Sequence, residues 1–450
     1  MKKVITYGTY DLLHEGHLNL LKRAKALGDY LIVGVTSDSF DQERGKLNVH
    51  HNVLKRIQAI RDINIADEII IEDYIGQKID DIQQHQIDVF VIGSDWEGQF
   101  DYLKEYCEVV YVPRTDGVSS TELRASVDSI YKVGVIGCGR IAKRFVPESK
   151  FVSRVEITSV FNPNLDEAKA FRDQFDLLSF HDDLESFLQN VDAIYIASPH
   201  LSHYDYIKIG LNSGKHVLCE IPLCLSEQQA IELYSLAKSK GLVLLEASKT
   251  AFSPGFLHLV SLVKSGIIGD VVDVQASLSK LQDNSLREFD VNQAGGCMTE
   301  LSPLPLMAMI KILGYQIKDM QFHSRIHNQV DVFTKGIFTY ENAISTITLG
   351  LGVKTEGNLV ISGTKGYLYV PSPWWKTEYF EVRFEDINQN RKFFYRYLEE
   401  GLRYELQEFV SMIVNKRTST FKLKEDESIL IAKIIEHYRQ GLGLRILGSN

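Results

Sequence analysis

The 450-residue sequence has few cysteines and prolines, five and ten respectively, and it has no long apolar run. An odd number of cysteines without a Cys-x-x-Cys pair argues against a disulfide framework or a zinc knot. No stretch approaches the roughly 18 uninterrupted apolar residues of a membrane-spanning helix, so we expect none. The first residues enter a strand-like pattern without an apolar leader. Together these absences predict a cytoplasmic protein.

An excess of basic residues is missing as well. The sequence holds 49 Lys and Arg against 59 Asp and Glu, and its formal net charge is −10. Because nucleic-acid binding requires clustered basic charge, we expect no nucleic-acid partner. The hydrophobic share of 44% and the charged share of 24% are instead typical of globular proteins. The length predicts two or three folding units.

The hydrophobic pattern begins a strand-turn-helix unit twice, once at residue 4 and again at residue 131. The first strand breaks at Gly8, and a helix follows from about His17 with Gly28 at its expected C-terminal cap. Alternation of strands with helical stretches predicts parallel sheets that bind ligands at their carboxyl ends. The further strands that we expect lie at 30–35, 68–71, 88–92 and 108–112, and then at 155–160, 192–197, 216–219 and 242–246.

The pattern changes after residue 250. Longer alternating strands are expected at 271–280, 333–351 and 358–370, followed by helices at 402–415 and 427–438. This order predicts an α+β domain with a large, open, mainly antiparallel sheet. The whole chain is therefore assigned to the α/β class, with domains at 1–128, 129–250 and 251–450.

The segment His14-Glu-Gly-His17 lies where the first strand passes into its helix. Both imidazoles can face one spot beside the helix N-terminus, where anions are favoured, and Gly16 lets a phosphate approach the backbone. By composition this motif is expected about 0.03 times by chance, so a coincidental pair is the weaker interpretation. Such a site can stabilise charge on a phosphate under attack and on a departing pyrophosphate. The sequence shows no cluster of further metal ligands to accompany these two histidines, so it does not indicate a zinc site.

Four segments carry a resemblance to a known family. They are 7–17, 28–34, 92–101 and 105–121. Over residues 1–126 the sequence resembles the glycerol-3-phosphate cytidylyltransferases. The resemblance implies a Rossmann-like nucleotidyltransferase domain that joins glycerol 3-phosphate, or a related polyol phosphate, to CMP from CTP with Mg²⁺. Its CDP-polyol product would feed teichoic-acid or capsule polymers. An adenylyltransferase of the same superfamily remains an alternative.

The same resemblance implies roles for individual residues. The implied catalytic residues are His14, His17, Lys46, Arg61 and Arg114. The implied CTP-binding residues are Thr9, Tyr10, His14, His17, Lys46, Arg114, Thr115, Gly117, Ser119, Ser120 and Thr121. Arg44 and Lys78 are implied on the substrate side. Glu15 stands where the family usually has an aromatic residue and Arg44 where lysine is common, so the acceptor alcohol stays open.

A glycine fingerprint, Gly137-Cys-Gly-Arg-Ile-Ala142, follows the strand that begins at residue 131 and opens a helix. This is the arrangement that a dinucleotide pyrophosphate requires. With the segments 197–203, 214–220, 265–272 and 295–301, residues 131–450 resemble the glucose-fructose oxidoreductase and inositol dehydrogenase family. The implied NAD or NADP contacts are Gly137, Gly139, Arg140, Ile141, Asn162, Ser198, His203 and Glu220. Asn162 stands where an acidic residue would select NAD, so the choice of dinucleotide is open.

The chemistry of this second part departs from the family. Members carry a lysine in Glu-Lys-Pro that handles the substrate proton, whereas this chain reads Glu220-Ile-Pro222, and Ile221 carries no proton. Either the part is inactive, or Lys249, Glu300 or His203 serves as the acid or base. An active part would reduce a keto precursor to the polyol phosphate.

Two other functions stay open at this point. One is an oxidoreductase whose N-terminal domain only binds nucleotide, and the other is a ligand-binding scaffold without catalysis. Because related enzymes of both families self-associate, we expect a homo-oligomer.

Overall fold

The computed structural model describes residues 1–43, 49, 51–74, 76–113 and 130–448. The chain forms two compact units, residues 1–130 and 131–450, which are described separately. The first unit contains one five-stranded sheet, and the second contains one sheet of six and one of nine strands. A separate domain boundary at residue 250 stays a prediction.

The sheet of the first unit is parallel throughout and has the order β3-β2-β1-β4-β5. The strand order reverses between β1 and β4, which makes their carboxyl ends the expected ligand site. Its strands are β1 (Lys3–Gly8), β2 (Tyr30–Thr36), β3 (Glu68–Glu72), β4 (Val89–Gly93) and β5 (Glu108–Val112). The predicted strands at 30–35, 68–71, 88–92 and 108–112 correspond to β2 to β5.

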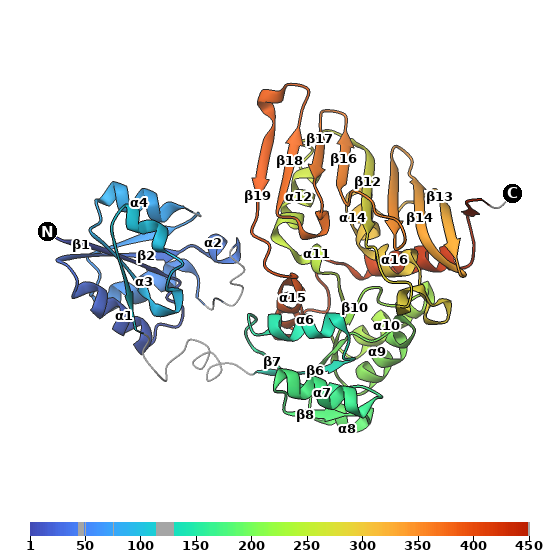
Figure 1. Ribbon diagram of the computed structural model, residues 1–450, viewed down its shortest axis with the longest axis horizontal. Helices are drawn as coiled ribbons and strands as arrows, with labels where there is room; N and C mark the ends of the chain where they lie inside the picture. The colour runs from blue at the N-terminus through green and yellow to red at the C-terminus, as the bar shows by residue number, and fades with distance from the viewer. Residues whose placement is uncertain (44–48, 50, 75, 114–129, 449–450) are drawn as a thin grey trace. The chain divides into compact units, whose positions relative to one another are not determined.

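Helices cover both faces of this sheet (Figure 1). Leu21, Ala24 and Ile60 of two helices pack on one face, while Ile82 packs with Phe90 on the other. The helices are α1 (Glu15–Lys25), α2 (Asp38–Glu43), α3 (Val53–Ile63) and α4 (Gln77–His85).

The predicted helix cap at Gly28 is wrong. Helix α1 ends at Lys25, and Ala26 is its cap in a right-handed conformation. Gly28 serves another purpose, because a Cβ there would lie 2.6 Å from the carbonyl oxygen of Lys2. The glycine therefore lets two backbone segments approach each other.

The second unit begins with a parallel sheet of order β11-β10-β9-β6-β7-β8. Its strands are β6 (Tyr131–Ile136), β7 (Val155–Phe161), β8 (Ser179–His181), β9 (Ala193–Ile196), β10 (His216–Glu220) and β11 (Leu244–Ala247). The first seven helices of the second unit are α6 (Arg140–Ser149), α7 (Leu165–Phe175), α8 (Leu184–Gln189), α9 (His203–Asn212), α10 (Glu227–Ser239), α11 (Lys249–Phe252) and α12 (Pro254–Lys264). Helices α8, α9 and α10 cover one face, and Phe145 of α6 stacks on Tyr195 on the other.

The nine-stranded sheet has the order β19-β18-β17-β16-β12-β15-β14-β13-β20. Six neighbouring pairs are antiparallel and two, β12 with β15 and β13 with β20, are parallel, so the sheet is mainly antiparallel as predicted. Its strands are β12 (Val271–Ser279), β13 (Asp319–His327), β14 (Val330–Thr339), β15 (Ile344–Gly350), β16 (Leu359–Gly363), β17 (Tyr367–Val370), β18 (Tyr379–Arg383), β19 (Arg391–Phe394) and β20 (Leu444–Ile446). The stretches predicted as 333–351 and 358–370 are each two strands.

Four more helices complete the second unit, namely α13 (Cys297–Leu301), α14 (Pro303–Leu313), α15 (Leu402–Val414) and α16 (Glu425–Arg439). Helix α14 packs on β12 and α16, whereas α15 returns to the six-stranded sheet and packs on α6 and α11. No single helix of the described chain is long and apolar enough to cross a membrane. One bent pair, Val291–Leu301 with Pro303–Leu313, passes by length and composition alone.

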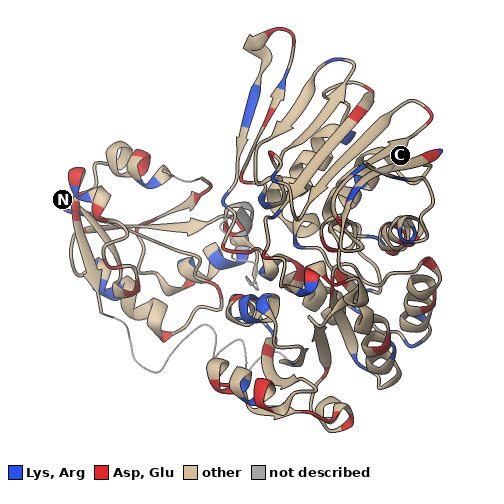
Figure 2. Ribbon diagram, turned by 45° about the vertical axis from the view of Figure 1, so that its right-hand side comes forward, with Lys and Arg blue, Asp and Glu red and all other residues tan. Residues whose placement is uncertain are grey.

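Acidic and basic residues are interspersed on both units (Figure 2).

Candidate functional sites

The two histidines of the first motif meet at the carboxyl end of β1. His14 caps α1 and is followed within the helix by His17. Their rings stack with centroids 3.8 Å apart and an interplanar angle of 23°, and both side chains are half-buried. The structure therefore brings the predicted imidazole pair together at a helix N-terminus, where an anion is favoured.

The loop between β1 and α1 is strained. Tyr10 has φ 52° and Leu12 has φ 43°, and neither is a glycine. A left-handed conformation costs such residues about 1–2 kcal/mol each. The Tyr10 side chain is 1% exposed and packs edge-on against the His17 ring, with centroids 5.4 Å apart. Its side chain thus supports the imidazole, and its predicted contact with the nucleotide stays a prediction.

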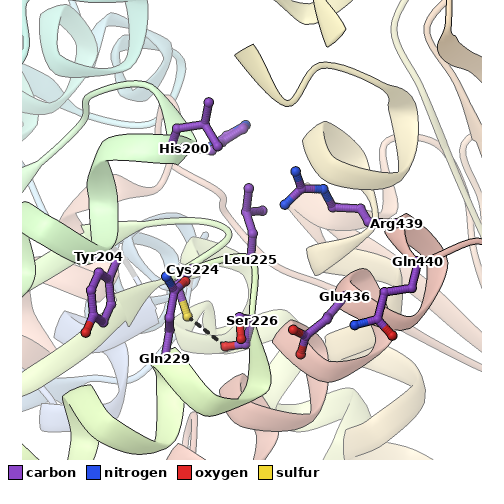
Figure 3. Close-up of a pocket in the computed structure, with 10 residues that line it drawn as sticks. His200, Tyr204, Cys224, Leu225, Ser226, Gln229, Glu436, Arg439 and Gln440 are labelled. Carbon is purple, nitrogen blue, oxygen red and sulfur yellow. Dashed lines mark hydrogen bonds between the residues drawn. The ribbon is translucent and has the colours of Figure 1, made fainter. Parts of the chain in front are cut away.

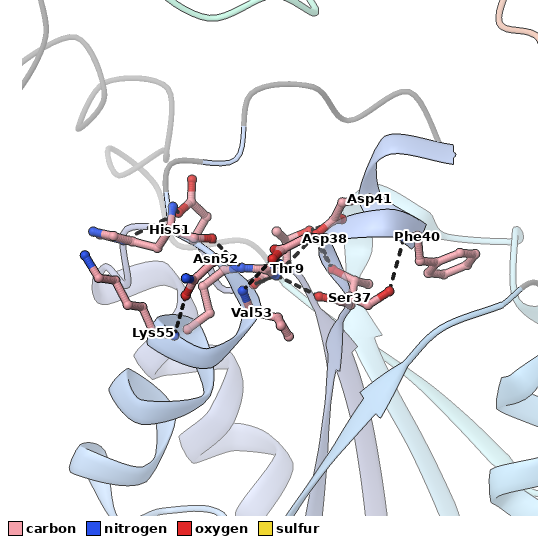
Figure 4. A network of polar contacts seen from close by, with 12 residues as sticks. Thr9, Ser37, Asp38, Phe40, Asp41, His51, Asn52, Val53 and Lys55 are labelled. Carbon is pink, nitrogen blue, oxygen red and sulfur yellow. Dashed lines mark hydrogen bonds and ion pairs between the residues drawn. The ribbon is translucent and has the colours of Figure 1, made fainter. Parts of the chain in front are cut away.

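A polar network holds this loop (Figure 4). The Thr9 hydroxyl donates to Asp41 Oδ1 at 3.0 Å, and the Thr36 hydroxyl donates to Asp41 Oδ2 at 2.7 Å. The backbone N–H of His51 donates to Asp11 Oδ1 at 3.0 Å. Buried polar groups that are satisfied in this way fix the conformation around them.

Arg56 is the centre of the network and is 1% exposed. Its Nη1 donates to the carbonyl oxygens of Thr9 at 2.8 Å and Thr36 at 2.9 Å. Its Nη2 bonds Asp38 Oδ1 at 2.6 Å, and its Nε donates to the His51 carbonyl at 2.9 Å. One side chain therefore ties together the ends of β1 and β2. The sequence analysis missed Arg56, although its spacing of four residues from the buried Ile60 was a signal.

Arg61 does not reach this network. It is exposed in the last turn of α3, about 12 Å along the helix axis from Val53. Because α3 runs away from the carboxyl edge, its first turns alone can contribute there. Arg61 therefore lies away from this network, and its charge-stabilising role stays a prediction.

Lys78 lies at the start of α4 and is already engaged. Its ammonium pairs with the buried Glu72 and lies 4.6 Å from the centroid of the Tyr7 ring. The Tyr7 hydroxyl in turn donates to Asp81 Oδ2 at 2.7 Å. The predicted contact of Lys78 with the substrate stays a prediction.

The remaining predicted residues of the first unit fall outside the described part of the chain. They are Arg44, Lys46, Arg114, Thr115, Gly117, Ser119, Ser120 and Thr121.

The glycine turn of the second unit fits a dinucleotide. Gly137 has φ 101°, and a Cβ there would lie 2.7 Å from the Ala197 carbonyl oxygen. Gly139 caps α6, whose first turn holds Arg140 and Ile141. Bare backbone at a helix N-terminus lets a pyrophosphate approach closely. Arg140 is paired with Glu288.

The other predicted cofactor positions lie at the same edge. Asn162 directly follows β7, Ser198 is the second residue after β9, and Glu220 ends β10. These strands neighbour β6 or one another in the sheet. The parallel sheet thus gathers residues that are far apart in sequence.

His203 is unsuited to act as a base. Its Nδ1 lies 2.9 Å from the Pro222 carbonyl and its Nε2 lies 2.9 Å from the Ser198 carbonyl. Burial, followed by the charge of His200, lowers the pKa of His203 to about 4, so the ring is neutral and has one N–H. Both nitrogens face backbone oxygens, and the ring ties the segment after β9 to the turn after β10.

Glu300 is held in its ionised form. Its Oε1 accepts from His200 Nε2 at 2.9 Å and pairs with Arg287 Nη1 at 3.0 Å. Burial opposes ionisation of Glu300, but the hydrogen bond from His200 and the charges of His200 and Arg287 outweigh it, and the pKa is lowered. The carboxylate therefore has no proton to donate near neutral pH.

Lys249 lies among carboxyl groups at the start of α11. Its Nζ is 3.2 Å from Glu400 Oε2, and its charge acts on Glu220 and Glu405. Burial raises the pKa of Glu220 to about 7, and Tyr195 donates a hydrogen bond to it. Burial and the charge of Glu220 raise the pKa of Glu405, which is fully buried on α15. Of the three proposed acid–base residues, Lys249 is the one that lies beside Glu220 and Glu400 at the end of β11.

A pocket of about 360 Å³ opens beside His200 (Figure 3). Ser226 and Gln229 at the start of α10 form one part of its wall, while Arg439 and Gln440 at the end of α16 form another. The sequence analysis missed this pocket because its walls are separated by more than 200 residues.

These two edges define the class of the protein. A nucleotidyltransferase-type α/β unit is joined to a dinucleotide-binding unit of the oxidoreductase type. Residues 5–126 match the cytidylyltransferase-like family, and residues 131–248 match the NAD-binding Rossmann-fold domain of an oxidoreductase family. Through its first unit the chain belongs to the glycerol-3-phosphate cytidylyltransferases. It is 55% identical over 130 residues to that enzyme of Bacillus spizizenii, which covers 29% of this chain and 100% of the relative.

The second unit resembles NAD(P)-dependent ketoreductases. The chain is 28% identical over 251 residues to the dTDP-3,4-didehydro-2,6-dideoxy-alpha-D-glucose 3-reductase of Actinomadura kijaniata, over 53% of this chain and 74% of the relative. A solved 3-ketoreductase from the same organism, in complex with NADP and TDP-benzene, superposes with a TM-score of 0.65 at 22% identity. The match covers 71% of this chain and 100% of that one, and it shows a shared fold.

Proposed function

We propose that the first unit transfers CMP from CTP to glycerol 3-phosphate, or to a closely related polyol phosphate, and releases pyrophosphate. The observation that carries this proposal is the stacked pair His14 and His17 at the N-terminus of α1, beside the point where the strand order reverses. The 55% identity to a glycerol-3-phosphate cytidylyltransferase supports the choice of CTP and of the acceptor.

The reaction needs charge stabilisation more than proton transfer. An acceptor phosphate oxygen, already ionised, attacks the α-phosphorus while the bond to the bridging oxygen breaks and pyrophosphate leaves. Imidazole donors and helix N–H groups stabilise the charge that develops on these oxygens. Mg²⁺ would arrive with the triphosphate. Lys46 and Arg114 complete the proposed set of cations around it.

A pyrophosphate-release screen tests this proposal. CTP and ATP are each supplied with glycerol 3-phosphate, erythritol 4-phosphate or ribitol 5-phosphate, and product is identified by mass. We expect release with CTP and one polyol phosphate. Release with ATP alone would favour the adenylyltransferase alternative, and CTP binding without any product would favour a scaffold.

The second unit, in this proposal, reduces a keto precursor to the polyol phosphate that the first unit activates. A bound nicotinamide would supply the hydride. Gly137 and Gly139 would leave room for the pyrophosphate, and Lys249 would hold the proton for the substrate oxygen. The position of Lys249 at the start of α11, directly after β11 and with its Nζ 3.2 Å from Glu400 Oε2, supports this role.

Oxidation of NADH or NADPH by dihydroxyacetone phosphate or a pentulose phosphate tests this second part. We expect turnover in the full chain and its loss in Lys249→Met. If the wild-type chain shows no turnover and only the Ile221→Lys variant does, the second unit of the wild-type chain is catalytically inactive.

The setting of the enzyme is also part of the proposal. All five cysteines are free thiols, which fits a reducing cytoplasm. We also propose that the chain forms a homo-oligomer and that its CDP-polyol product is used in teichoic-acid or capsule synthesis. Light scattering on the purified chain measures the oligomeric state.

A further inference from the structure

A carboxylate from α7, that of Glu167, lies at the carboxyl end of β7. Asn162 follows the strand and has no charge of its own. Its Nδ2 donates to Glu167 Oε2 at 3.1 Å, and Glu167 lies in the first turn of α7. The Asn164 side chain caps this helix by accepting from the backbone N–H of Glu167 at 3.3 Å. Two asparagines thus hold Glu167 at the strand end.

This carboxylate borders the glycine turn. The N–H of Gly137 donates to the carbonyl of Phe161, the last residue of β7, at 2.9 Å. The Cys138 thiol of this turn interacts with both residues: burial raises its pKa, a hydrogen bond with Asn162 lowers it, and the charge of Glu167 raises it. In this type of fold, the adenosine ribose of a dinucleotide is read at the end of the strand that follows the glycine turn.

The surrounding charges are mostly negative. The segments 162–167 and 181–185 contain five acidic residues and no Lys or Arg; the acids are Asp166, Glu167, Asp182, Asp183 and Glu185. Lys143 of α6 is the one cation whose charge acts on Cys138. A ribose 2′-hydroxyl can donate a hydrogen bond to a carboxylate here, whereas a 2′-phosphate would be repelled by it.

We infer that Glu167 makes the second unit prefer NAD(H) over NADP(H), because α7 supplies the carboxylate that Asn162 lacks. The inference rests on the dinucleotide role proposed above. It distinguishes this chain from the solved 3-ketoreductase of Actinomadura kijaniata, which was crystallised with NADP.

Titration of the full chain with NADH and with NADPH tests the inference, with energy transfer from tryptophan to nicotinamide as the signal. We expect NADH to bind at least roughly tenfold more tightly. Glu167→Gln is expected to bring the two dissociation constants together, mainly by tightening NADPH. Asp166→Asn is the matched control, since it removes a charge from the same turn but no contact with Asn162, and it should keep most of the preference.

Tighter binding of NADPH, or an unchanged ratio in Glu167→Gln, would overturn the inference while leaving the dinucleotide role intact. If the chain binds neither NADH nor NADPH, both the inference about Glu167 and the proposed dinucleotide role are wrong. CTP-dependent pyrophosphate release by the same wild-type sample reports separately on the first unit. Asn162→Asp provides a second variant, because a carboxylate on the strand end itself should widen the preference for NADH.

Discussion

The turn after β1 and the turn after β6 occupy equivalent places in their sheets but are built to meet a phosphate in different ways. The first places two imidazoles there, on a loop with non-glycine residues in left-handed conformations that Arg56 and Asp41 hold in place. The second places bare glycine backbone there and needs no such network. In the first unit, buried polar contacts hold the loop that carries the imidazoles. In the second unit, the glycine backbone itself forms the turn.

The largest expected effect concerns the imidazoles. His17→Ala should lower CTP-dependent pyrophosphate release about 100- to 1000-fold, which is the usual loss when one preorganised donor to a developing charge is removed. Steady-state kinetics measures this effect. His85→Ala, on α4, is the control and should retain activity. Equal activity of His17→Ala and wild type would place the chemistry elsewhere.

The next effect concerns the network. Arg56→Met should destabilise the first unit by about 3–5 kcal/mol, because it leaves the buried carboxylate of Asp41 without its cation and the carbonyl groups of Thr9 and Thr36 without their donor. Urea unfolding of this unit measures the change. Arg61→Met, on the exposed side of the same helix, should stay within about 0.5 kcal/mol. If both variants lose the same stability, the loop is not held by Arg56.

The glycine turn predicts a smaller effect in the second unit. Gly137→Ala should destabilise that unit by about 2–3 kcal/mol and weaken dinucleotide binding, because its φ is positive and its Cβ meets the Ala197 carbonyl. Gly139→Ala has an ordinary φ and 3.9 Å of clearance from the same oxygen. Thermal unfolding should therefore separate the two variants, and a reversed order would contradict this account of the turn.

The smallest effect is a pH dependence confined to the second unit. Burial raises the pKa of Glu246 from 4.5 to about 7, while its Oε1 accepts from the Leu223 N–H. The folded state therefore holds a proton that the unfolded state releases. The stability that this proton contributes is complete below about pH 4.5 and is lost as pH rises through 7.

Between pH 5 and 8 the free energy of unfolding of this unit should fall by about 2 kcal/mol through Glu246. Glu246→Gln should make the dependence shallower, as chemical denaturation at each pH would show. The slope that remains belongs to Glu220 and Glu405, whose pKa values are also raised, and an unchanged slope would contradict the role of Glu246.

Local pattern was enough to predict most elements of the fold. Most strands of both parallel sheets, the helices at 402–415 and 427–438 and the mainly antiparallel third sheet agree with the structure to within a few residues, whereas β8 was not predicted. These features depend on hydrophobic periodicity and turn residues that act over a few positions. The error at Gly28 arose because a glycine after a helix reads as a cap, whereas its contact with Lys2 is made across 26 residues.

The sequence by itself determined where the predicted anion sites lie, because His14 and His17, like Gly137 and Gly139, stand where a strand passes into a helix. Only the tertiary structure decided which side chains support those turns. Arg56 reaches the end of β1 from α3, and His203 joins the segment after β9 to the turn after β10. Such pairings depend on which strands become neighbours, and short-range patterns carry no information about that choice.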